Sequence, residues 1–458
     1  MTGSADVVVL GAGPAGLAAA TQTARSGRSV VVLERSRHVG GLAASIEVAG
    51  VRADLGSHRL HPATPPHVLA DLRRLLGADL QTRPRNGRLR VAGRWFGFPL
   101  RAGELLRALP PSLTAGIALD ALTAPLRRPR ADTYVEVLRV GLGGRLSTAL
   151  HAPYAEKLWG LPPERIDGEQ ARRRVTADTP WKIVARLLRG RDEQGRVFHY
   201  PRRGFGQIVE ALAAAATDAG AEIRLGTEVT GVEGTGDRVG VQGIDGDGVD
   251  AGHVLSTVPL PLLARLAGGP VPDPPLRFRA MVLVYLVHEG PRRWTPYDAH
   301  YLPGPEIAVT RISEPANYRD SAADPTDRTV LCAEIPCDVG DATWSAPDED
   351  LVRAVADGLA RVGLPPVRLA GAHVRRLPHV YPVYEVGHAA RLAALDAWAR
   401  ALPRVTTFGR LGLFAHDNTH HALAEAYDAV AALRADGARD EAAWSAARQR
   451  FAGHVVED

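Results

Sequence analysis

The run Gly11-Ala12-Gly13-Pro14-Ala15-Gly16 constrains the fold more than any other part of this 458-residue sequence. A strongly apolar run, residues 7–10, predicts a strand directly before it, and the Ala- and Leu-rich stretch after it predicts a helix. Gly11 permits a tight turn, Gly13 lets the backbone approach a pyrophosphate, and Gly16 lets helix and strand pack closely. The helix N-terminus would offer free N–H groups to the phosphates. The run therefore predicts a dinucleotide-binding β-α-β unit.

An acidic residue completes this unit. A second predicted strand, residues 29–33, ends in Glu34, close to the usual spacing of about 20 residues from the last glycine. A carboxylate at that position accepts hydrogen bonds from ribose hydroxyls. NAD-binding and FAD-binding proteins share this pattern, so the choice between the two cofactors depends on the residues that follow.

The continuation favours FAD. A paired glycine, Gly40-Gly41, follows Glu34 and would bring a second backbone loop to the phosphates. An acid followed closely by two glycines resembles the flavin amine oxidase and protoporphyrinogen oxidase superfamily. The run Asp54-Leu55-Gly56-Ser57-His58 is similar to the D-x-G-x-H segment beside the flavin in that superfamily.

Further similarities extend over nearly the whole chain. Residues 154–160 resemble the Y-x-x-K-x-W-G element of the superfamily, and residues 198–206 resemble its Y-P-x-x-G-x-G approach to a helix. Residues 255–259 look like the strand end that returns near FAD. Val229, after Glu228, stands where members contact the adenine side through a valine backbone.

The C-terminal part carries a glycine turn, residues 408–414, followed by a predicted helix from about His421 to Ala435. The resemblance implies that this turn closes over FAD and that the helix points its N-terminus at the flavin. A reduced flavin carries negative charge there, which a helix N-terminus stabilises.

The same turn also resembles UDP-galactopyranose mutase, as do residues 309–315 and the run Tyr381-Pro382-Val383. That resemblance implies that Arg311 binds a substrate diphosphate. Glu334 stands near where a second mutase arginine is expected, and Asn418-Thr419 replaces the aspartate-methionine pair at the flavin. These departures weaken the prediction of UDP-sugar binding.

The candidate catalytic residues are His58 and His416 as acid or base groups, Arg311 as a contact to an anion, and Tyr384 beside the mutase-like run. His416, His420 and His421 also have a spacing that could gather metal ligands. Because this segment already has an expected flavin role, no metal is predicted. The residues expected to bind FAD are Gly11, Gly13, Pro14, Ala15, Gly16, Glu34, Arg35, Gly41, Leu42, Gly56, Ser57, His58, Val229, Gly409, Arg410, Asn418, Thr419 and His420.

The predicted fold class is α/β, with a Rossmann-type FAD-binding domain of the GR2-like kind and an inserted mixed-sheet and helical substrate domain. The FAD-binding domain takes residues 1–62, 197–265 and, with a tail helix, 388–458. A helical substrate-side region takes residues 63–196, and a mixed-sheet substrate domain takes residues 266–387.

Composition excludes several other classes. The net charge is +4 and arginines are scattered, which disfavours nucleic-acid binding. No apolar run is long enough to span a membrane, and no secretory signal precedes the first strand, so the cytoplasm is expected. Cys332 and Cys337 are interpreted as two buried residues, not as a zinc site or a disulfide.

These features predict an FAD-dependent oxidoreductase, with flavin N5 as hydride acceptor. The substrate is expected to be a small molecule. The options are a sugar, a nucleotide sugar or a specialised metabolite, and an anionic compound is one of the alternatives. The alternative is a redox-neutral flavin-dependent sugar isomerase resembling UDP-galactopyranose mutase. A non-catalytic FAD-binding scaffold is disfavoured, because the second half of the chain offers more pocket-forming material than a cofactor needs. The oligomeric state is not predicted.

Overall fold

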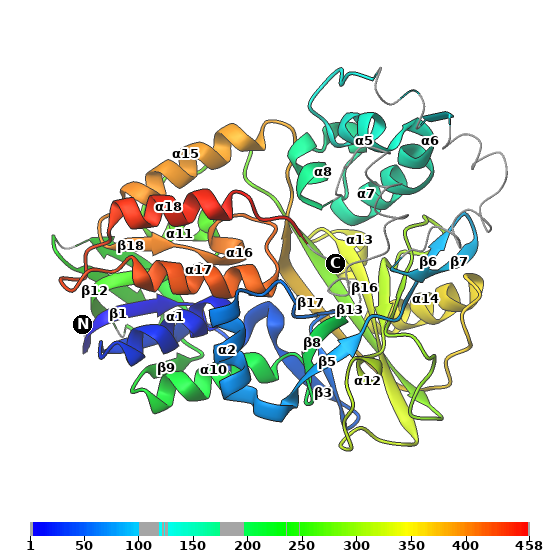
Figure 1. The fold of residues 1–458 in the computed structure, drawn as a ribbon, viewed down its shortest axis with the longest axis horizontal. Helices are drawn as coiled ribbons and strands as arrows, with labels where there is room; N and C mark the ends of the chain where they lie inside the picture. Colours follow the sequence, from blue (N-terminus) through cyan, green and yellow to red (C-terminus); the bar gives the residue numbers. More distant parts are fainter. Residues whose placement is uncertain are drawn as a thin grey trace.

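The computed structural model describes residues 3–99, 119–120, 123, 127–174, 197–234, 236–246 and 248–456. Two large sheets organise it (Figure 1). The first sheet has the order β10-β11-β12-β1-β2-β9, with β18 also paired to β12. Its strands are β1 (Gly3–Leu10), β2 (Val30–Glu34), β9 (Glu222–Leu225), β10 (Val229–Gly234), β11 (Val239–Gly243), β12 (Gly248–Ser256) and β18 (Val405–Thr407).

The first sheet is buried on both faces, which explains its continuous apolar strands. Val7 and Val9 of β1 face a core shared with three helices, whereas Val8 and Leu10 face the opposite core. This alternation follows from the two-residue period of a strand. The helices on the first side are α1 (Pro14–Arg25), α10 (Gln207–Asp218) and α17 (Thr419–Ala431); α11 (Leu260–Leu266) and α15 (His388–Ala401) lie on the other.

The second sheet has the order β17-β13-β16-β15-β14-β6-β7, and it is mixed because β14 runs parallel to β6. Helix α14 (Asp348–Arg361) packs on one face through Leu351, Val355 and Leu359. The other face packs against β4 (Val51–Asp54), on the side of the first sheet. The strands are β6 (Gly87–Val91), β7 (Arg94–Phe98), β13 (Phe278–Glu289), β14 (Ala299–Tyr301), β15 (Arg311–Ser313), β16 (Arg328–Cys337) and β17 (Leu369–Pro382).

A small group of helices with its own apolar core lies above the second sheet in Figure 1. It contains α5 (Tyr134–Leu142), α6 (Gly144–Leu146), η4 (Ser147–His151), α7 (Ala152–Trp159), η5 (Pro163–Arg165) and α8 (Gly168–Arg174). The other elements are η1 (Gly41–Ala43), β3 (Ser45–Val48), α2 (Pro66–Leu76), η2 (Gly77–Asp79), β5 (Leu80–Pro84), β8 (Val197–Pro201), α12 (Pro315–Tyr318), α13 (Ala342–Ser345), α16 (Gly409–Gly412) and α18 (Glu441–Phe451).

The α/β fold class and the mixed second sheet agree with the sequence prediction. The expectation of a mostly helical region over residues 63–196 is wrong for its first part, where β5, β6 and β7 form. Part of the reason is tertiary, since β5 pairs with β8 and β6 pairs with β14, both far along the chain. Strands β6 and β7 also form a local hairpin with each other. The predicted helical pattern of residues 100–118 and 175–196 lies outside the described residues.

Helix α17 begins at Thr419, two residues before the predicted start, and ends at Ala431. A capping box sets this start, because the Asn418 side chain accepts from the backbone of His421 and the His421 side chain accepts from Asn418 N–H. In the described residues, no helix combines the length and apolar character that a membrane crossing requires.

Candidate functional site

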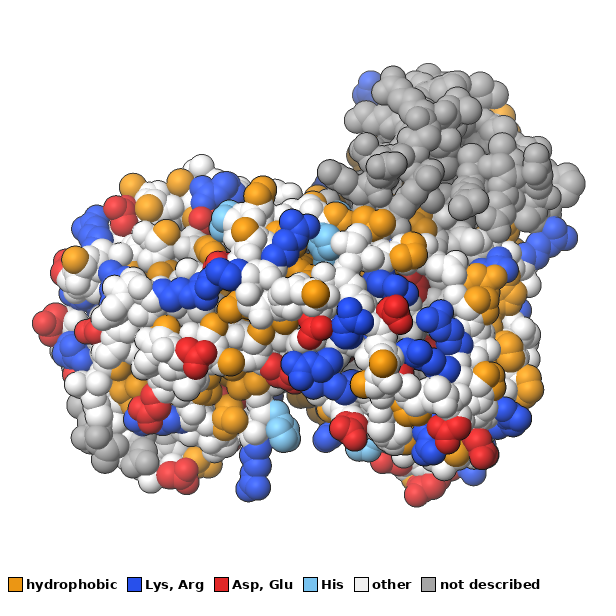
Figure 2. All heavy atoms as spheres, turned by 60° about the horizontal axis from the view of Figure 1, so that its bottom comes forward, with side chains coloured by type: hydrophobic (Ala, Val, Ile, Leu, Met, Phe, Trp, Pro, Cys, Tyr) orange, Lys and Arg blue, Asp and Glu red, His pale blue; other side chains and the backbone are white. Residues whose placement is uncertain are grey.

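A cavity of about 1210 Å³ lies between the two sheets. Loops at the carboxyl ends of the first sheet form one side, and the inner face of the second sheet forms the other. The space-filling view shows the molecule notched between these two halves, with basic side chains on the same face (Figure 2).

Most of the residues expected at FAD line this cavity. They are Gly11, Gly13, Pro14, Ala15, Glu34, Arg35, Gly41, Leu42, Gly56, Ser57, His58, Val229, Gly409, Arg410, Asn418 and Thr419. Of the expected catalytic residues, His58 and Arg311 line it as well. Gly16, His420, Tyr384 and His416 do not.

The two glycine loops meet in a space that suits a pyrophosphate. A Cβ on Gly41 would lie 3.3 Å from Gly13 Cα, so the two backbones approach closely. A Cβ on Gly13 would meet no atom within 4 Å, because this position opens toward the cavity. Gly11 has a φ of +99°, which an L side chain rarely adopts. The loops therefore fit the diphosphate of FAD by backbone approach.

Gly16 allows close packing of helix α1 and does not line the cavity. A Cβ there would lie 1.9 Å from the carbonyl oxygen of Gly11, so only glycine permits helix α1 to sit this close to the turn. The atom that such a Cβ would meet belongs to the backbone, so no flexible side chain could move aside to relieve the overlap.

Glu34 ends β2 at the cavity. Its carboxylate accepts the backbone N–H groups of Ala12 and Ser36, each at 2.8 Å. These bonds hold the acid beside the glycine turn, and each carboxylate oxygen keeps a further lone pair for a ribose hydroxyl.

The C-terminal turn brings a helix N-terminus and an arginine to the cavity. Asn418 and Thr419 stand at the start of α17 and line the cavity. Arg410 donates to the main-chain oxygens of Asp417 at 2.6 Å and of Val380 at 3.2 Å, and its guanidinium stands 5.2 Å from the Tyr381 ring centre. Burial lowers the pKa of Arg410. The helix end fits the electron-rich edge of a flavin.

The inner wall is built around Glu334. Arg311 donates to both oxygens of its carboxylate at 2.9 Å, and Ser57 N–H donates at 2.8 Å. His58 contacts the carbonyl of Leu55 at 3.1 Å through Nε2 and stacks on Phe205. Burial lowers the pKa of His58, so its imidazole is neutral at pH 7.

The structure corrects the expectation that Tyr384 and His416 face the substrate. The Tyr384 hydroxyl donates to the carbonyl of Phe414 at 3.0 Å, and its ring stacks on His388. His416 is 0% exposed and contacts Gln170 through Nε2 at 3.1 Å. Both side chains pack in the protein interior, where Tyr384 is 2% and His416 is 0% exposed.

His420 also lies outside the cavity lining, on the buried side of α17. Its ring contacts those of His421 and His61, at centroid distances of 4.0 and 5.6 Å. The helical period explains this placement, because Thr419 and His420 point in different directions from the same turn.

Three basic or aromatic residues of the cavity, Arg174, Arg59 and Tyr381, were not among the predicted site residues. Arg174 stands over the rings of Trp159 and Tyr381, at 5.0 and 4.9 Å from their centres. Arg59 pairs with Asp298 at 3.1 Å. Tyr381 belongs to the mutase-like run, and Arg59 directly follows His58. Arg174 ends the arginine run of residues 172–174, whose positive charge the sequence offers as one option for attracting an anionic substrate.

Cys332 and Cys337 are free and buried, as the sequence interpretation expected. They pair with β13 residues within the second sheet, so they belong to the core and not to the cavity.

Comparison with known proteins identifies the family context of this site. Residues 14–421 match the model of the flavin containing amine oxidoreductases. A phytoene dehydrogenase of Streptomyces griseus is 30% identical over 334 residues, which are 64% of this chain and 62% of that protein. The (S)-6-hydroxynicotine oxidase of Paenarthrobacter nicotinovorans is 28% identical over 289 residues, 58% of this chain and 62% of that enzyme. The matches thus span about three fifths of the length of these curated relatives.

Among solved structures, that of reduced UDP-galactopyranose mutase superposes with a TM-score of 0.77 at 19% identity, covering 93% of each chain. At this identity the likeness concerns the fold alone.

Proposed function

The chain belongs to the family of flavin-containing amine oxidoreductases, and on that premise we propose that it oxidises a small organic molecule in the cavity between its two sheets. Its cofactor is FAD. When bound, FAD supplies a ring nitrogen, N5, that accepts a hydride from a C–H bond of the substrate.

One observation carries this proposal. A single cavity runs from the glycine turn, Gly11 to Gly13, to the wall made by Ser57, Arg311 and Glu334. A dinucleotide held at the first end therefore has its reactive end beside the inner face of the second sheet, where a substrate has room.

Different residues of the cavity take different roles in this proposal. The backbone at Gly11, Gly13 and Gly41 approaches the diphosphate, and Glu34 accepts from ribose hydroxyls. With FAD bound, the N-terminus of α17 would offer its positive dipole end to the electron-rich edge of the flavin. Neutral His58 is the candidate group for accepting a proton from the substrate.

The cavity wall also favours an anionic or electron-rich substrate. Arg410 donates its hydrogen bonds to the main-chain oxygens of Val380 and Asp417, which are uncharged, so these bonds leave the guanidinium charge without a counter-charge from these partners. Arg174 lies beside it against the same Tyr381 ring. Two cations on one aromatic ring create a positive potential at that end of the cavity.

The alternative is redox-neutral isomerisation of a nucleotide sugar. Arg174 and Arg410, which both stand against the Tyr381 ring, support anion binding. Arg311, the residue that most resembles a diphosphate contact, instead forms an ion pair with Glu334. Oxidation is therefore the function that the geometry favours.

The test is reduction of the enzyme-bound flavin without oxygen. The holoenzyme is mixed anaerobically with a panel that contains secondary and aromatic amines, a carotenoid precursor and UDP-galactopyranose, and the oxidised flavin absorbance is recorded. We expect one class of compound to bleach it and to be recovered oxidised. Turnover that appears only after dithionite reduction, without net oxidation of the sugar, would instead establish the isomerase.

A further inference from the structure

One buried side chain of α17, that of Glu425, contacts both ends of the segment 409–417, which lies between β18 and this helix. At the first end, Gly409 N–H donates to Glu425 Oε2 at 2.7 Å. At the other end, the carboxyl group of Asp417 forms a hydrogen bond with the carboxyl group of Glu425. Glu425 is 0% exposed, so both contacts are shielded from water. A single residue therefore joins the two ends of this segment.

The contact between the two carboxyl groups requires a proton. Ionised carboxylates only accept hydrogen bonds, and two of them side by side repel each other. Asp417 Oδ2 and Glu425 Oε1 are buried, and no N–H or O–H group of the described residues donates to either oxygen. One proton held between the carboxyl groups satisfies both oxygens. The pair therefore carries one negative charge instead of two.

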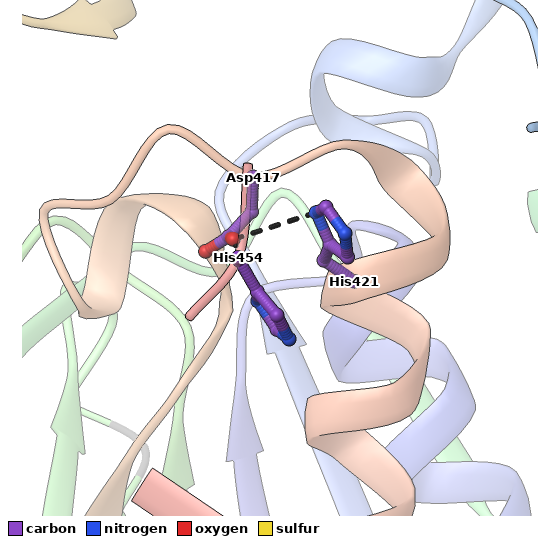
Figure 3. A group of neighbouring side chains, drawn as sticks. All are labelled: Asp417, His421 and His454. Carbon is purple, nitrogen blue, oxygen red and sulfur yellow. Dashed lines mark hydrogen bonds and ion pairs between the residues drawn. The ribbon is translucent and has the colours of Figure 1, made fainter. Parts of the chain in front are cut away.

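The surroundings of Asp417 decide which carboxyl group keeps the proton. Figure 3 shows the rings of His421 and His454 beside the Asp417 carboxylate. Because His421 Nδ1 accepts the N–H of Asn418, the donor to Asp417 Oδ1 is His454 Nδ1, at 2.9 Å. Although burial opposes ionisation, the hydrogen bond with His454 lowers the pKa of Asp417. Burial and the charge of Asp417 raise the pKa of Glu425 well above its ordinary value, so the proton belongs to Glu425.

The neighbouring cations do not form ion pairs with Glu425. Arg448, whose charge acts on Glu425, donates to Asp396 at 2.8 Å. Arg410 donates to the main-chain oxygen of Asp417 at 2.6 Å. His454 Nδ1 is 3.6 Å from Glu425 Oε1, which is farther than its contact with Asp417. Glu425 thus accepts at Oε2 from Gly409 and donates through its other oxygen to Asp417.

The segment that Glu425 closes forms part of the cavity wall. Gly409, Arg410 and Asp417 line the cavity. Gly409 has a φ of +79°, and a Cβ there would lie 3.1 Å from Ala15 Cβ, at the start of α1. A displacement of Gly409 would therefore change the wall beside the dinucleotide turn. A displacement of Asp417 would move the main-chain oxygen that holds Arg410.

We propose that Glu425 is a positioning residue of the FAD site, because as a neutral carboxylic acid it ties Gly409 to Asp417 and so holds Arg410 in the cavity wall. Glu425 does not line the cavity itself and acts through these neighbours. The role needs one donor and one acceptor on the same side chain. Glutamine offers both, whereas leucine, of similar size, offers neither. No local sequence pattern marks Glu425, since Gly409 lies 16 residues away.

Infrared spectroscopy of the FAD-bound protein near neutral pH tests the protonation. The C=O stretch of a carboxylic acid is separate from the carboxylate bands and shifts in D2O. In the difference between wild type and Glu425→Gln, we expect one such band to be lost. The control Glu349→Gln, at an exposed position of α14, should keep it. A spectrum in which no carboxylic acid band depends on Glu425 would overturn the proposal.

FAD affinity tests the positioning role. In equilibrium dialysis of the holoenzymes, with free FAD measured by its fluorescence, Glu425→Leu should raise the Kd for FAD at least about 10-fold. Glu425→Gln should stay within about 2-fold of wild type, since it restores the donor and the acceptor. Circular dichroism confirms that each variant is folded. Wild-type affinity in Glu425→Leu, or an equal loss in Glu425→Gln, would contradict the role.

If Glu425→Leu does not fold, the infrared band and the affinity of Glu425→Gln still decide the outcome. None of these readouts uses turnover, so they stand apart from the proposed oxidation.

Discussion

Arg311 on β15 and Glu334 on β16 form a two-bond ion pair, with Nε and one terminal nitrogen each 2.9 Å from a carboxylate oxygen. The antiparallel register places the two residues directly opposite each other. Because Glu334 also accepts the N–H of Ser57, the pair holds the loop that carries His58. The wall of the cavity is thus neutralised where the mutase resemblance implied a free cation.

Removing Arg311 should destabilise the protein more than it changes catalysis. Arg311→Ala leaves Glu334, whose side chain is 4% exposed, without its counter-charge, at a cost of about 3–5 kcal/mol. Differential scanning calorimetry of the FAD-bound protein should show a clearly lower Tm. The double variant Arg311→Met, Glu334→Gln should recover much of the lost stability, since neither of these two positions then carries a buried charge. An Arg311→Ala protein with unchanged Tm but catalytic efficiency reduced by about 10- to 100-fold would instead assign this arginine to the substrate.

Two glycines of one turn should respond differently to valine. Gly13→Val places its side chain in open space toward the cavity, so the chain should fold but lose FAD. Gly16→Val drives a Cβ into the Gly11 carbonyl, so folding itself should suffer. Circular dichroism and flavin content of the purified proteins separate the two outcomes. Full flavin occupancy in Gly13→Val would show that the diphosphate lies elsewhere.

Tyr384→Phe should leave turnover nearly unchanged. The hydroxyl donates only to the Phe414 carbonyl and lies outside the cavity lining, so its loss should cost about 1 kcal/mol of stability. Steady-state kinetics together with Tm measure both effects. If turnover instead slowed by about two orders of magnitude while Tm stayed normal, the catalytic role expected from sequence would be restored.

Acid stability should depend on His253 in the first sheet. Its Nδ1 contacts Gly437 O and its Nε2 contacts the Thr406 hydroxyl, each at 2.9 Å, and burial lowers its pKa to about 3. Between the ordinary pKa of about 6.5 and about 3, the unfolded state binds a proton that the folded state excludes. Stability should therefore fall with decreasing pH in this window, by about 1.4 kcal/mol per pH unit from this group.

The variant His253→Gln should remove that dependence. Proton uptake on unfolding at about pH 5 should fall by nearly one per chain, as measured by calorimetry in buffers of different ionisation enthalpy. The comparison variant is His38→Gln, since His38 is exposed. Equal proton uptake in wild type and His253→Gln would contradict the assignment.

The cofactor half of the site was predictable because its determinants are local. The glycine turn, the strands on either side and Glu34 all fall within about 30 residues, the length of one β-α-β unit, and each works through backbone geometry. In the strand order of the first sheet, β1 and β2 lie side by side between β12 and β9, and Figure 1 shows α1 beside β1. Asn418 and Thr419 were placed by resemblance, and the capping box between Asn418 and His421 gives a physical reason for the position of Asn418.

The sequence by itself determined a dinucleotide fold, because spacing of glycines and apolar residues encodes turns and buried strands. Tertiary structure alone decided which side chains meet. On β16, Ala333 and Ile335 pack in the core under α14, whereas Glu334 points to the cavity, and a register shift of one residue would exchange these faces. The partner of Arg311, the burial of Tyr384 and His416, and the approach of His454 to Asp417 all depend on such pairing across long sequence separations. No local pattern specifies it, since it results from how two sheets and a C-terminal segment pack together.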